Sequence, residues 1–270
     1  MSFFTSLSGM RNAETDLRVI SHNIANAETA GFKKSNASFS DLVATGGGAD
    51  PRLTPGIGAA VSSINQDFGL GSLEQTGRGL DVAINGDGFF ATANPISGDL
   101  TFTRNGNLQI VANGQLQDSS GDLVQAFTVD AAGNTTSTVP ADVIVPTTNG
   151  AGSTLSSVSI DRRGVVSASY SDGSNEAVAK IALASFPATG GLRPIGQTKW
   201  EASADSGNPE YGDPGVGNFG QLMAGSLERS NVDLADEMVA LLTAQRNFQA
   251  NARAIDTATA ISQTVLNLQR

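Results

Sequence analysis

The sequence predicts an α+β protein, with long N- and C-terminal helices forming a coiled-coil domain and a central Gly-rich antiparallel β domain between them. Three observations predict this class. Apolar residues recur at helical spacing at both ends of the chain, and short alternating runs separated by turn dipeptides fill the middle. In addition, 31 of the 270 residues are Gly while only 6 % are aromatic, which favours turn-rich β structure between the helices.

Residues 1–44 are expected to hold the N-terminal helix and the start of a connector. From Phe3 to about Ala27 the apolar residues follow one another at helical steps, without a Pro in the run. We expect this helix to end near Asn26, because the Ala30-Gly31 step beyond it is a typical stop signal. The residues expected to face another helix are Leu7, Met10, Leu17, Ile20 and Ile24.

Residues 231–270 are expected to form a C-terminal coiled-coil helix that packs with residues 1–27. The segment contains no Gly or Pro, and at about 1.5 Å per residue a helix over 232–269 is roughly 55 Å long. Positions 234 to 266 step by four and three without a break, although positions 245, 259 and 262 are polar. The apolar members of this heptad stripe are Leu234, Met238, Leu241, Phe248, Ala252, Ile255 and Leu266. Asn231 or Asp233 is expected to cap the helix.

The middle of the chain divides into a linker and conjoining segment at 45–75, a central β domain at 76–206 and a return linker at 207–230. Within the β domain, short alternating runs are separated by dipeptides that favour tight hairpin turns, namely Asn85-Gly86, Asn105-Gly106, Asn113-Gly114 and Asp172-Gly173. The glycines at Gly46-Gly47-Gly48 and from Gly215 to Gly217 predict hinges, because Gly tolerates wide changes of backbone angle.

Charge and composition argue against several classes of protein. The net charge of −10 disfavours binding to nucleic acid or anionic lipid, and no segment approaches the roughly 20 apolar residues of a membrane span. The chain has no Cys, which excludes disulfides and thiolate chemistry. Charged residues from Arg11 to Arg18 interrupt the region where a signal peptide would need an apolar run, so any export is expected to proceed without a cleaved signal peptide.

No catalytic, metal or cofactor site is expected. His22 is the single His, it lies in the predicted N-terminal helix, and no Cys or second His accompanies it. Gly77-Arg78-Gly79 precedes a predicted strand, whereas a phosphate loop lies between a strand and a helix. An enzyme on a β scaffold, such as a glycosidase with paired carboxylates, stays open as an alternative, although one Trp and two Tyr are few for a sugar-binding groove.

The two terminal helices are predicted to differ in length. About 25 residues at the N-terminus can cover only part of a C-terminal helix of nearly 40 residues, so part of the apolar stripe lacks a partner within one chain. An exposed apolar stripe favours association, and copies of the same chain are the expected partner.

Several motifs resemble those of bacterial flagellar rod and hook proteins. The N-terminal resemblance rests on 6–10, 20–27 and 29–34, and the C-terminal one on 225–234 and 245–248. The residues that carry these signatures include Asn23, Asn26, Gly31, Phe32, Ser230, Asn231, Val232, Asp233, Gln245 and Arg246. Segments 66–73 and 80–90 resemble the conjoining β segment of the same family.

The resemblance implies a structural subunit of a helical tube that transmits motor torque, with the terminal helices inside and the β domain outside. The implied partners are the chain itself, adjacent axial proteins of the rod and the hook–filament junction, the hook cap and the flagellar export apparatus. It also implies a place in the hook or basal body, outside the cell, after type III export.

The motifs favour a hook subunit over a distal rod subunit. The run at 247–251 and the direct passage from Phe39 to the Gly-rich linker are hook-like, whereas the stretch from Asp130 to Thr154 is too short for the outer domain of most hook proteins. A distal rod subunit is therefore the alternative. A surface adhesin or stalk protein is the alternative of a different class, although no tandem repeats are visible.

Overall fold

The computed structural model describes residues 2–43, 56–130 and 132–268, and the chain divides into two compact units. Unit 1 comprises Met1–Ala27, Lys34–Asp67 and Val232–Arg270, and unit 2 comprises Glu28–Lys33 and Phe68–Asn231. The glycines Gly46-Gly47-Gly48, which the sequence predicts to be a hinge, lie outside the described residues.

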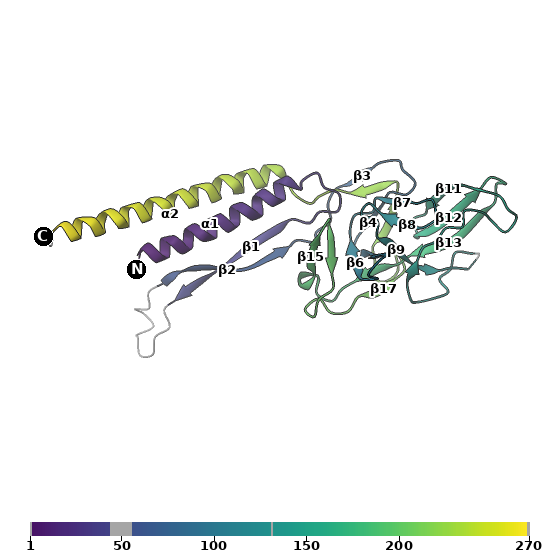
Figure 1. Ribbon diagram of the computed structural model, residues 1–270, viewed down its shortest axis with the longest axis horizontal. Coiled ribbons are helices and arrows are strands. Elements are labelled where there is room, and N and C mark those ends of the chain that lie inside the picture. Colours follow the sequence, from purple (N-terminus) through teal and green to yellow (C-terminus); the bar gives the residue numbers. More distant parts are fainter. Residues whose placement is uncertain (1, 44–55, 131, 269–270) are drawn as a thin grey trace. The chain divides into compact units, whose positions relative to one another are not determined.

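Unit 1 contains two long helices and one β-hairpin. These are α1 (Ser2–Ala25), α2 (Leu234–Leu268), β1 (Ser35–Val43) and β2 (Gly56–Gln66). The two helices run antiparallel, and α1 contacts α2 on one side and both strands of the hairpin on the other (Figure 1). The predicted helices are thus present, with ends within two residues of those expected, and α1 is the middle layer of the unit.

The start of α2 follows from its sequence. Asp233 stands just before the first helical residue, and its Oδ1 accepts hydrogen bonds from the backbone N–H groups of Ala235 (2.8 Å) and Asp236 (3.3 Å). This is the N-cap that the sequence predicts, because the first N–H groups of a helix have no partner within the helix. The acidic residues of the first turn, Asp236 and Glu237, also suit the positive end of the helix dipole.

The β1–β2 hairpin differs from the sequence-based expectation, which placed 35–44 in the start of a connector and 45–75 in a linker and conjoining segment. Its strands pair over Ser35↔Gln66 to Val43↔Gly56, with two register shifts. Small and polar residues dominate both strands, and these shifts interrupt the two-residue alternation by which strands are recognised. The hairpin forms because packing against α1 covers one of its faces, which a local sequence window does not reveal.

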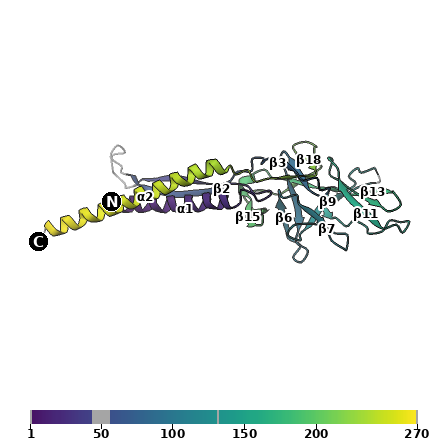
Figure 2. The same cartoon turned by 90° about the horizontal axis from the view of Figure 1, so that it is seen from above.

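Unit 2 is a β domain in which every strand pairing among the described residues is antiparallel. Its main sheet has thirteen strands, with β11-β12-β13-β9-β5-β6-β16-β15 as the central path. Figure 2 labels β6, β7, β9, β11, β13 and β15 of this sheet. Two further pairs, β18-β4 and β19-β3, complete the unit. The strands are β3 (Leu73–Gln75), β4 (Val82–Asn85), β5 (Phe89–Ala93), β6 (Leu100–Thr103), β7 (Leu108–Ile110), β8 (Leu116–Asp118), β9 (Leu123–Thr128), β10 (Ala141–Asp142), β11 (Leu155–Ile160), β12 (Val165–Tyr170), β13 (Asn175–Ile181), β14 (Leu183–Ser185), β15 (Arg193–Gly196), β16 (Lys199–Glu201), β17 (Glu210–Gly212), β18 (Gln221–Ala224) and β19 (Ser226–Glu228).

Of the four predicted hairpin turns, Asn113-Gly114 joins the paired strands β7 and β8, and Asp172-Gly173 joins the paired strands β12 and β13. The prediction is wrong for Asn85-Gly86 and Asn105-Gly106, because the strands that flank each of them pair with other strands instead. Gly86, Gly114 and Gly173 have positive φ, which Gly adopts without the strain other residues suffer. By contrast, the expected return linker at 207–230 contains β17, β18 and β19. These strands have only three or four residues each and pair with β14, β4 and β3, far away in the sequence, so local pattern alone does not predict them.

Two hydrophobic clusters form the core of unit 2. The larger one is aliphatic and includes Val82, Ile84, Leu116, Ile181 and Leu222. The smaller one is aromatic and is built from edge-to-face pairs, such as Phe102 with Phe186, whose ring centroids are 4.7 Å apart. Trp200, the single Trp of the chain, lies in this second cluster and is 2 % exposed.

Candidate assembly surface and terminal-motif network

The predicted heptad stripe of α2 is only partly used within the chain. Leu241, Phe248, Ala252 and Ile255 are half-buried, whereas Leu234, Met238 and Leu266 are 43 %, 51 % and 65 % exposed. Among the helix positions whose burial is described, the buried and half-buried ones centre on the frame Glu237, Leu241, Ala244, Phe248, Asn251, Ile255 and Ala258, with Ala240 and Ala252 beside it. The face of α2 that contacts α1 is thus rotated by about one residue from the predicted face. This rotation leaves Leu234, Met238 and Leu266 of the predicted stripe exposed.

Small residues explain this rotated frame. Ala244 of α2 and Ala13 of α1 are both buried, and a Cβ atom on Gly9 of α1 would lie 2.7 Å from Oδ1 of Asn251. Small side chains let the two helix backbones approach closely, and this favours the face that carries them over the face richest in large apolar residues. The α1 residues Leu7, Met10, Leu17 and Ile24 are half-buried, and Ile20 is buried.

Asn23 connects three elements of unit 1. Its Nδ2 donates to the Ser35 carbonyl (2.9 Å) and to Oε2 of Glu237 (3.3 Å), and its Oδ1 accepts from the Ser35 N–H (2.9 Å). The side chain is therefore bonded to the first residue of β1 and to the first turn of α2. Because Asn23 is buried, the loss of its side chain would leave the Ser35 N–H and carbonyl without this hydrogen-bond partner, at a place where water does not readily replace it.

A second network, inside unit 2, joins the N-terminal motif to the C-terminal motif. Lys33 Nζ donates to Oε1 of Glu228 (2.5 Å) and to the Gly69 carbonyl (2.7 Å). The Gly71 N–H donates to the same Glu228 oxygen (3.0 Å), and the Glu228 carbonyl accepts from the Gly31 N–H (2.8 Å). The side chains of Lys33 and Glu228 are fully buried, so the ion pair is shielded from water and salt.

Arg104 approaches the same carboxylate from the other side. Its Nη1 lies 3.5 Å from Oε2 of Glu228 and donates to the Gly86 carbonyl (2.9 Å), and its guanidinium stands over the Phe89 ring, 5.1 Å from the centroid. Burial lowers the pKa of Arg104, while the charges of Glu228 and Asp87 act in the opposite direction. Glu228 thus has two buried cations as neighbours.

The remaining motif residues have varied surroundings. Phe32 and Ser230 are buried, Val232 is half-buried, and Gln245 and Arg246 are exposed. Gly31 has φ +70°, and a Cβ atom there would lie 2.6 Å from the Asn105 nitrogen, so this position requires Gly. The side-chain amides of Asn26 and Asn231 donate to the carbonyls of His22 (2.9 Å) and Gly69 (3.3 Å), respectively.

Sequence reasoning missed Glu237, Lys33, Glu228 and Arg104 as site residues. Lys33 lies in the motif at 29–34 and Glu228 in the motif at 225–234. Their opposite charges were the one feature of the sequence that could have suggested an ion pair. Their contact spans 195 positions, however, and nothing local in the sequence pairs them.

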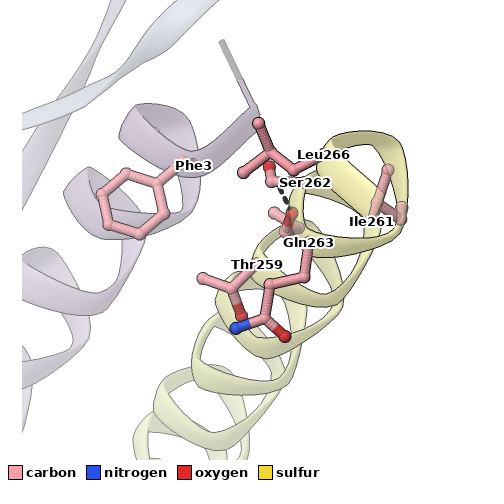
Figure 3. Close-up of a pocket in the computed structure, with 7 residues that line it drawn as sticks. Phe3, Thr259, Ile261, Ser262, Gln263 and Leu266 are labelled. Carbon is pink, nitrogen blue, oxygen red and sulfur yellow. Dashed lines mark hydrogen bonds between the residues drawn. The ribbon is translucent and has the colours of Figure 1, made fainter. Parts of the chain in front are cut away.

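A groove lies in unit 1 between the first turn of α1 and the last turns of α2 (Figure 3). It has a volume of about 460 Å³ and is lined by Phe3, Ala258, Thr259, Ile261, Ser262, Gln263 and Leu266. The lining contains no titratable side chain, and the Ser262 hydroxyl donates to the Ala258 carbonyl (2.9 Å). The groove therefore offers apolar contacts and hydroxyl and amide groups, and its lining has no acidic or basic side chain.

Neither a metal centre nor a membrane helix is seen in the part of the chain that the structure describes. Within residues 2–43, 56–130 and 132–268, no cluster of three or more His, Asp or Glu side chains could hold a metal ion. The helices within these ranges are too short or too polar to cross a membrane.

Three family models match successive parts of the chain. Residues 4–33 match the model described as flagella basal body rod protein, residues 83–168 the flagellar hook protein FlgE/F/G D1 domain, and residues 223–268 the flagellar basal body rod FlgEFG protein C-terminal. The flagellar basal-body rod protein FlgG of Bacillus subtilis is 35 % identical over 282 residues, which cover all of this chain and 99 % of the relative.

The chain belongs to the flagellar rod and hook protein family.

Further relatives distinguish members of the family. The FlgG protein of Caulobacter vibrioides is 32 % identical, with 98 % of each chain covered. The flagellar hook protein FlgE of Salmonella typhimurium is 27 % identical, and the alignment needs 411 residues to cover both chains completely, against the 270 residues here. These relatives favour the rod alternative over the hook identity that the sequence motifs favoured, and the length of the chain agrees with them.

The two members of the buried Lys33–Glu228 ion pair lie in two different family matches. Lys33 is the last residue of the N-terminal match, which covers 4–33. Glu228 lies near the start of the C-terminal match, which covers 223–268. Both terminal segments of the family fold therefore contribute one member of the Lys33–Glu228 ion pair. This gives the two family segments a direct contact within unit 2.

Proposed function

We propose that this chain is a structural subunit of the distal rod of the bacterial flagellum, where it polymerises into a helical tube that transmits motor torque. One observation carries the proposal: FlgG of Bacillus subtilis aligns with the whole chain over nearly its own whole length. A hook protein of the Salmonella typhimurium type has many positions with no counterpart here.

The surface of unit 1 supports polymerisation. Leu234, Met238, Leu242 and Leu266 of α2 are each more than two-fifths exposed, although α1 covers another face of the same helix. Exposed apolar stripes of this kind mark association sites. In the assembled tube, the two helices pair as a coiled coil and form the inner wall with copies of the same chain, while unit 2 lies outside.

The proposed role needs no catalysis or cofactor. Its partners are other copies of the chain, the axial proteins that adjoin it in the rod and the export apparatus that delivers it. We place the assembled protein in the flagellar basal body, outside the cell, after type III export.

A deletion strain tests the proposal. Basal bodies purified from a strain that lacks this chain should end in a short rod without a hook, and the intact gene should restore the full rod. Electron microscopy of purified wild-type protein should show tubes of helical symmetry. A complete rod that lacks only the hook would assign the chain to the hook instead, the second candidate, which the full-length match to the Salmonella typhimurium hook protein supports.

A further inference from the structure

The chain crosses between unit 1 and unit 2 four times, and three segments of unit 2 flank these crossings. They are 28–33, 68–72 and 228–231, and we call them the first, second and third connecting segments. Every covalent link between the two units ends in one of them. A force that acts between the units along the covalent chain therefore reaches unit 2 through the connecting segments.

The connecting segments are largely irregular in structure. All their residues are described, and 28–33 and 68–72 contain neither helix nor strand, while 228–231 contains only the last residue of β19. Irregular segments open at a lower free-energy cost than helices and strands that are packed in a core. A released segment of the length of 28–33 could extend to about 20 Å, since an extended chain spans about 3.4 Å per residue. Such segments transmit force without lengthening only if they are fastened.

Glu228, in the third connecting segment, fastens the other two. Its Oε1 accepts hydrogen bonds from Lys33 Nζ (2.5 Å) in the first segment and from the Gly71 N–H (3.0 Å) in the second. Its backbone carbonyl accepts from the Gly31 N–H (2.8 Å), again in the first segment. One residue thus holds both other segments, through its side chain and through its backbone.

Further hydrogen bonds join the second connecting segment to its two neighbours. The Gly69 carbonyl accepts from Lys33 Nζ (2.7 Å) and from Asn231 Nδ2 (3.3 Å). The Arg229 N–H donates to the Ser72 carbonyl (2.8 Å). Each pair of connecting segments is therefore bonded directly, within a few residues of the crossings between the units.

The bonds around Glu228 are buried and anchored to the main sheet of unit 2. Arg104, the residue that follows β6, lies 3.5 Å from the second carboxylate oxygen of Glu228. The side chains of Lys33 and Glu228 are fully buried, so water does not compete for their ion pair, and the low local dielectric strengthens it. A Cβ atom on Gly71 would lie 2.0 Å from the Arg229 carbonyl oxygen, so a larger residue there would push the second and third segments apart.

We infer that the buried network of Glu228, Lys33 and Arg104 is a mechanical clasp, which keeps the connecting segments from extending when force acts between unit 1 and unit 2. The inference rests on the proposed function, because a rod subunit that transmits torque carries force along its chain. It assigns to Glu228 a role under load, in addition to its contribution to the stability of unit 2 at rest.

Force spectroscopy on the full chain tests the clasp. Ser62→Cys in β2 and Ser171→Cys in the turn between β12 and β13 provide attachment points, because both serines are exposed and the chain has no Cys of its own. The covalent path between these points enters unit 2 along 68–72. In optical tweezers at constant force, release of this segment lengthens the molecule by up to about 17 Å, or about 3.4 Å per residue.

Two variants weaken the clasp to different extents. At the same force, Glu228→Gln should release 68–72 at least about tenfold faster than the parent with the two cysteines, because removing one partner of a buried ion pair is strongly destabilising. Lys33→Met should also speed the release, by a smaller factor, since Glu228 keeps Arg104 as its partner. Circular dichroism checks that both variants are folded, and the milder Lys33→Met serves if Glu228→Gln does not fold.

Lys199→Met is the matched control. Lys199 is a buried cation that pairs with Asp118 (2.7 Å) and Asp122, and none of the three lies in a connecting segment. The variant should lower the stability of unit 2 towards urea, since it also breaks a buried ion pair. It should leave the release rate of 68–72 within about twofold of the parent, because distant sites act independently. This comparison distinguishes a clasp from a general loss of stability.

The outcomes separate the clasp from the proposed function. Release of 68–72 at the parent's rate in Lys33→Met and in folded Glu228→Gln would overturn the clasp, as would an equal acceleration by Lys199→Met. The rod assignment would then stand, because the force is measured on single chains without assembly. A deletion strain that builds a complete rod would overturn the rod assignment, and with it the role of the clasp in torque transmission, whatever the release rates.

Discussion

Replacing Glu228 by Gln should destabilise unit 2 strongly. The substitution keeps the size of the side chain and removes the one negative charge that directly contacts both Lys33 (2.5 Å) and Arg104 (3.5 Å). Lys33 and Glu228 have fully buried side chains, and that of Arg104 is 3 % exposed. Two cations would then remain in a dry interior with no carboxylate between them.

The magnitude follows from this burial. Removing one partner of a buried ion pair typically costs about 3–5 kcal/mol, because the charge that remains is buried without compensation. With a urea dependence of about 2 kcal/mol per molar, the midpoint of unfolding should fall by roughly 2 M. Lys33→Met should cost less, since Glu228 would keep Arg104 as its partner.

The fluorescence of Trp200 offers a direct assay. It is the single Trp, it is buried, and it lies in the same unit as Glu228, so its emission during urea unfolding reports on unit 2. Glu201→Gln is the matched control, because its ion pair with Arg193 is exposed. We expect this control to leave the midpoint almost unchanged.

The ranking of the three variants by their loss of stability tests whether the buried network stabilises unit 2. The expected loss of stability is largest for Glu228→Gln, smaller for Lys33→Met and smallest for Glu201→Gln. If Glu228→Gln unfolded within about 0.5 M urea of the wild type, the buried network would contribute little to stability, and the physical argument would be refuted.

Four further predictions concern the terminal helices and motifs. Asn23→Ala should cost about 1–3 kcal/mol, measured by thermal unfolding, and should speed amide exchange at the start of β1, because two backbone groups lose their partner. Gly31→Ala should lower the melting temperature of unit 2 more than Gly98→Ala does; both glycines have positive φ, but only at Gly31 would a Cβ meet the backbone. Burial raises the pKa of Asp16, so its charged form opposes folding at neutral pH; Asp16→Asn should be slightly more stable than the wild type at pH 7, with the difference vanishing in acid as the carboxyl protonates. A chain without 232–270 should stay soluble and monomeric in sedimentation experiments, and polymers of this truncated chain would contradict the assembly role of α2.

The bounds of α2, its N-cap and several turns can be predicted from the sequence. Steps of three and four and the absence of Gly and Pro predict α2 almost to the residue, because these features act locally along one helix. Asp233 is predictable as a cap for the same reason. The turns at Gly114 and Gly173 follow from a backbone conformation that Gly tolerates best.

The face of each helix that is buried is less predictable. The stripe richest in large apolar residues predicts Leu234 and Met238 at the helix contact, yet both are largely exposed, and Ala244 is buried in their place. Helix contacts depend on how closely two backbones approach, and small residues on the partner helix, such as Gly9 and Ala13, decide that distance.

By itself, therefore, the sequence determined the α+β class, the two helices, the cap of α2 and the family, since each of these follows from local spacing or from short ordered motifs. Only the tertiary structure decided that β1 and β2 pair with each other on α1, that Lys33 contacts Glu228, and which side of α2 is left uncovered. These features join residues far apart in the chain, and the free energy that stabilises them comes from burial and charge pairing across that separation.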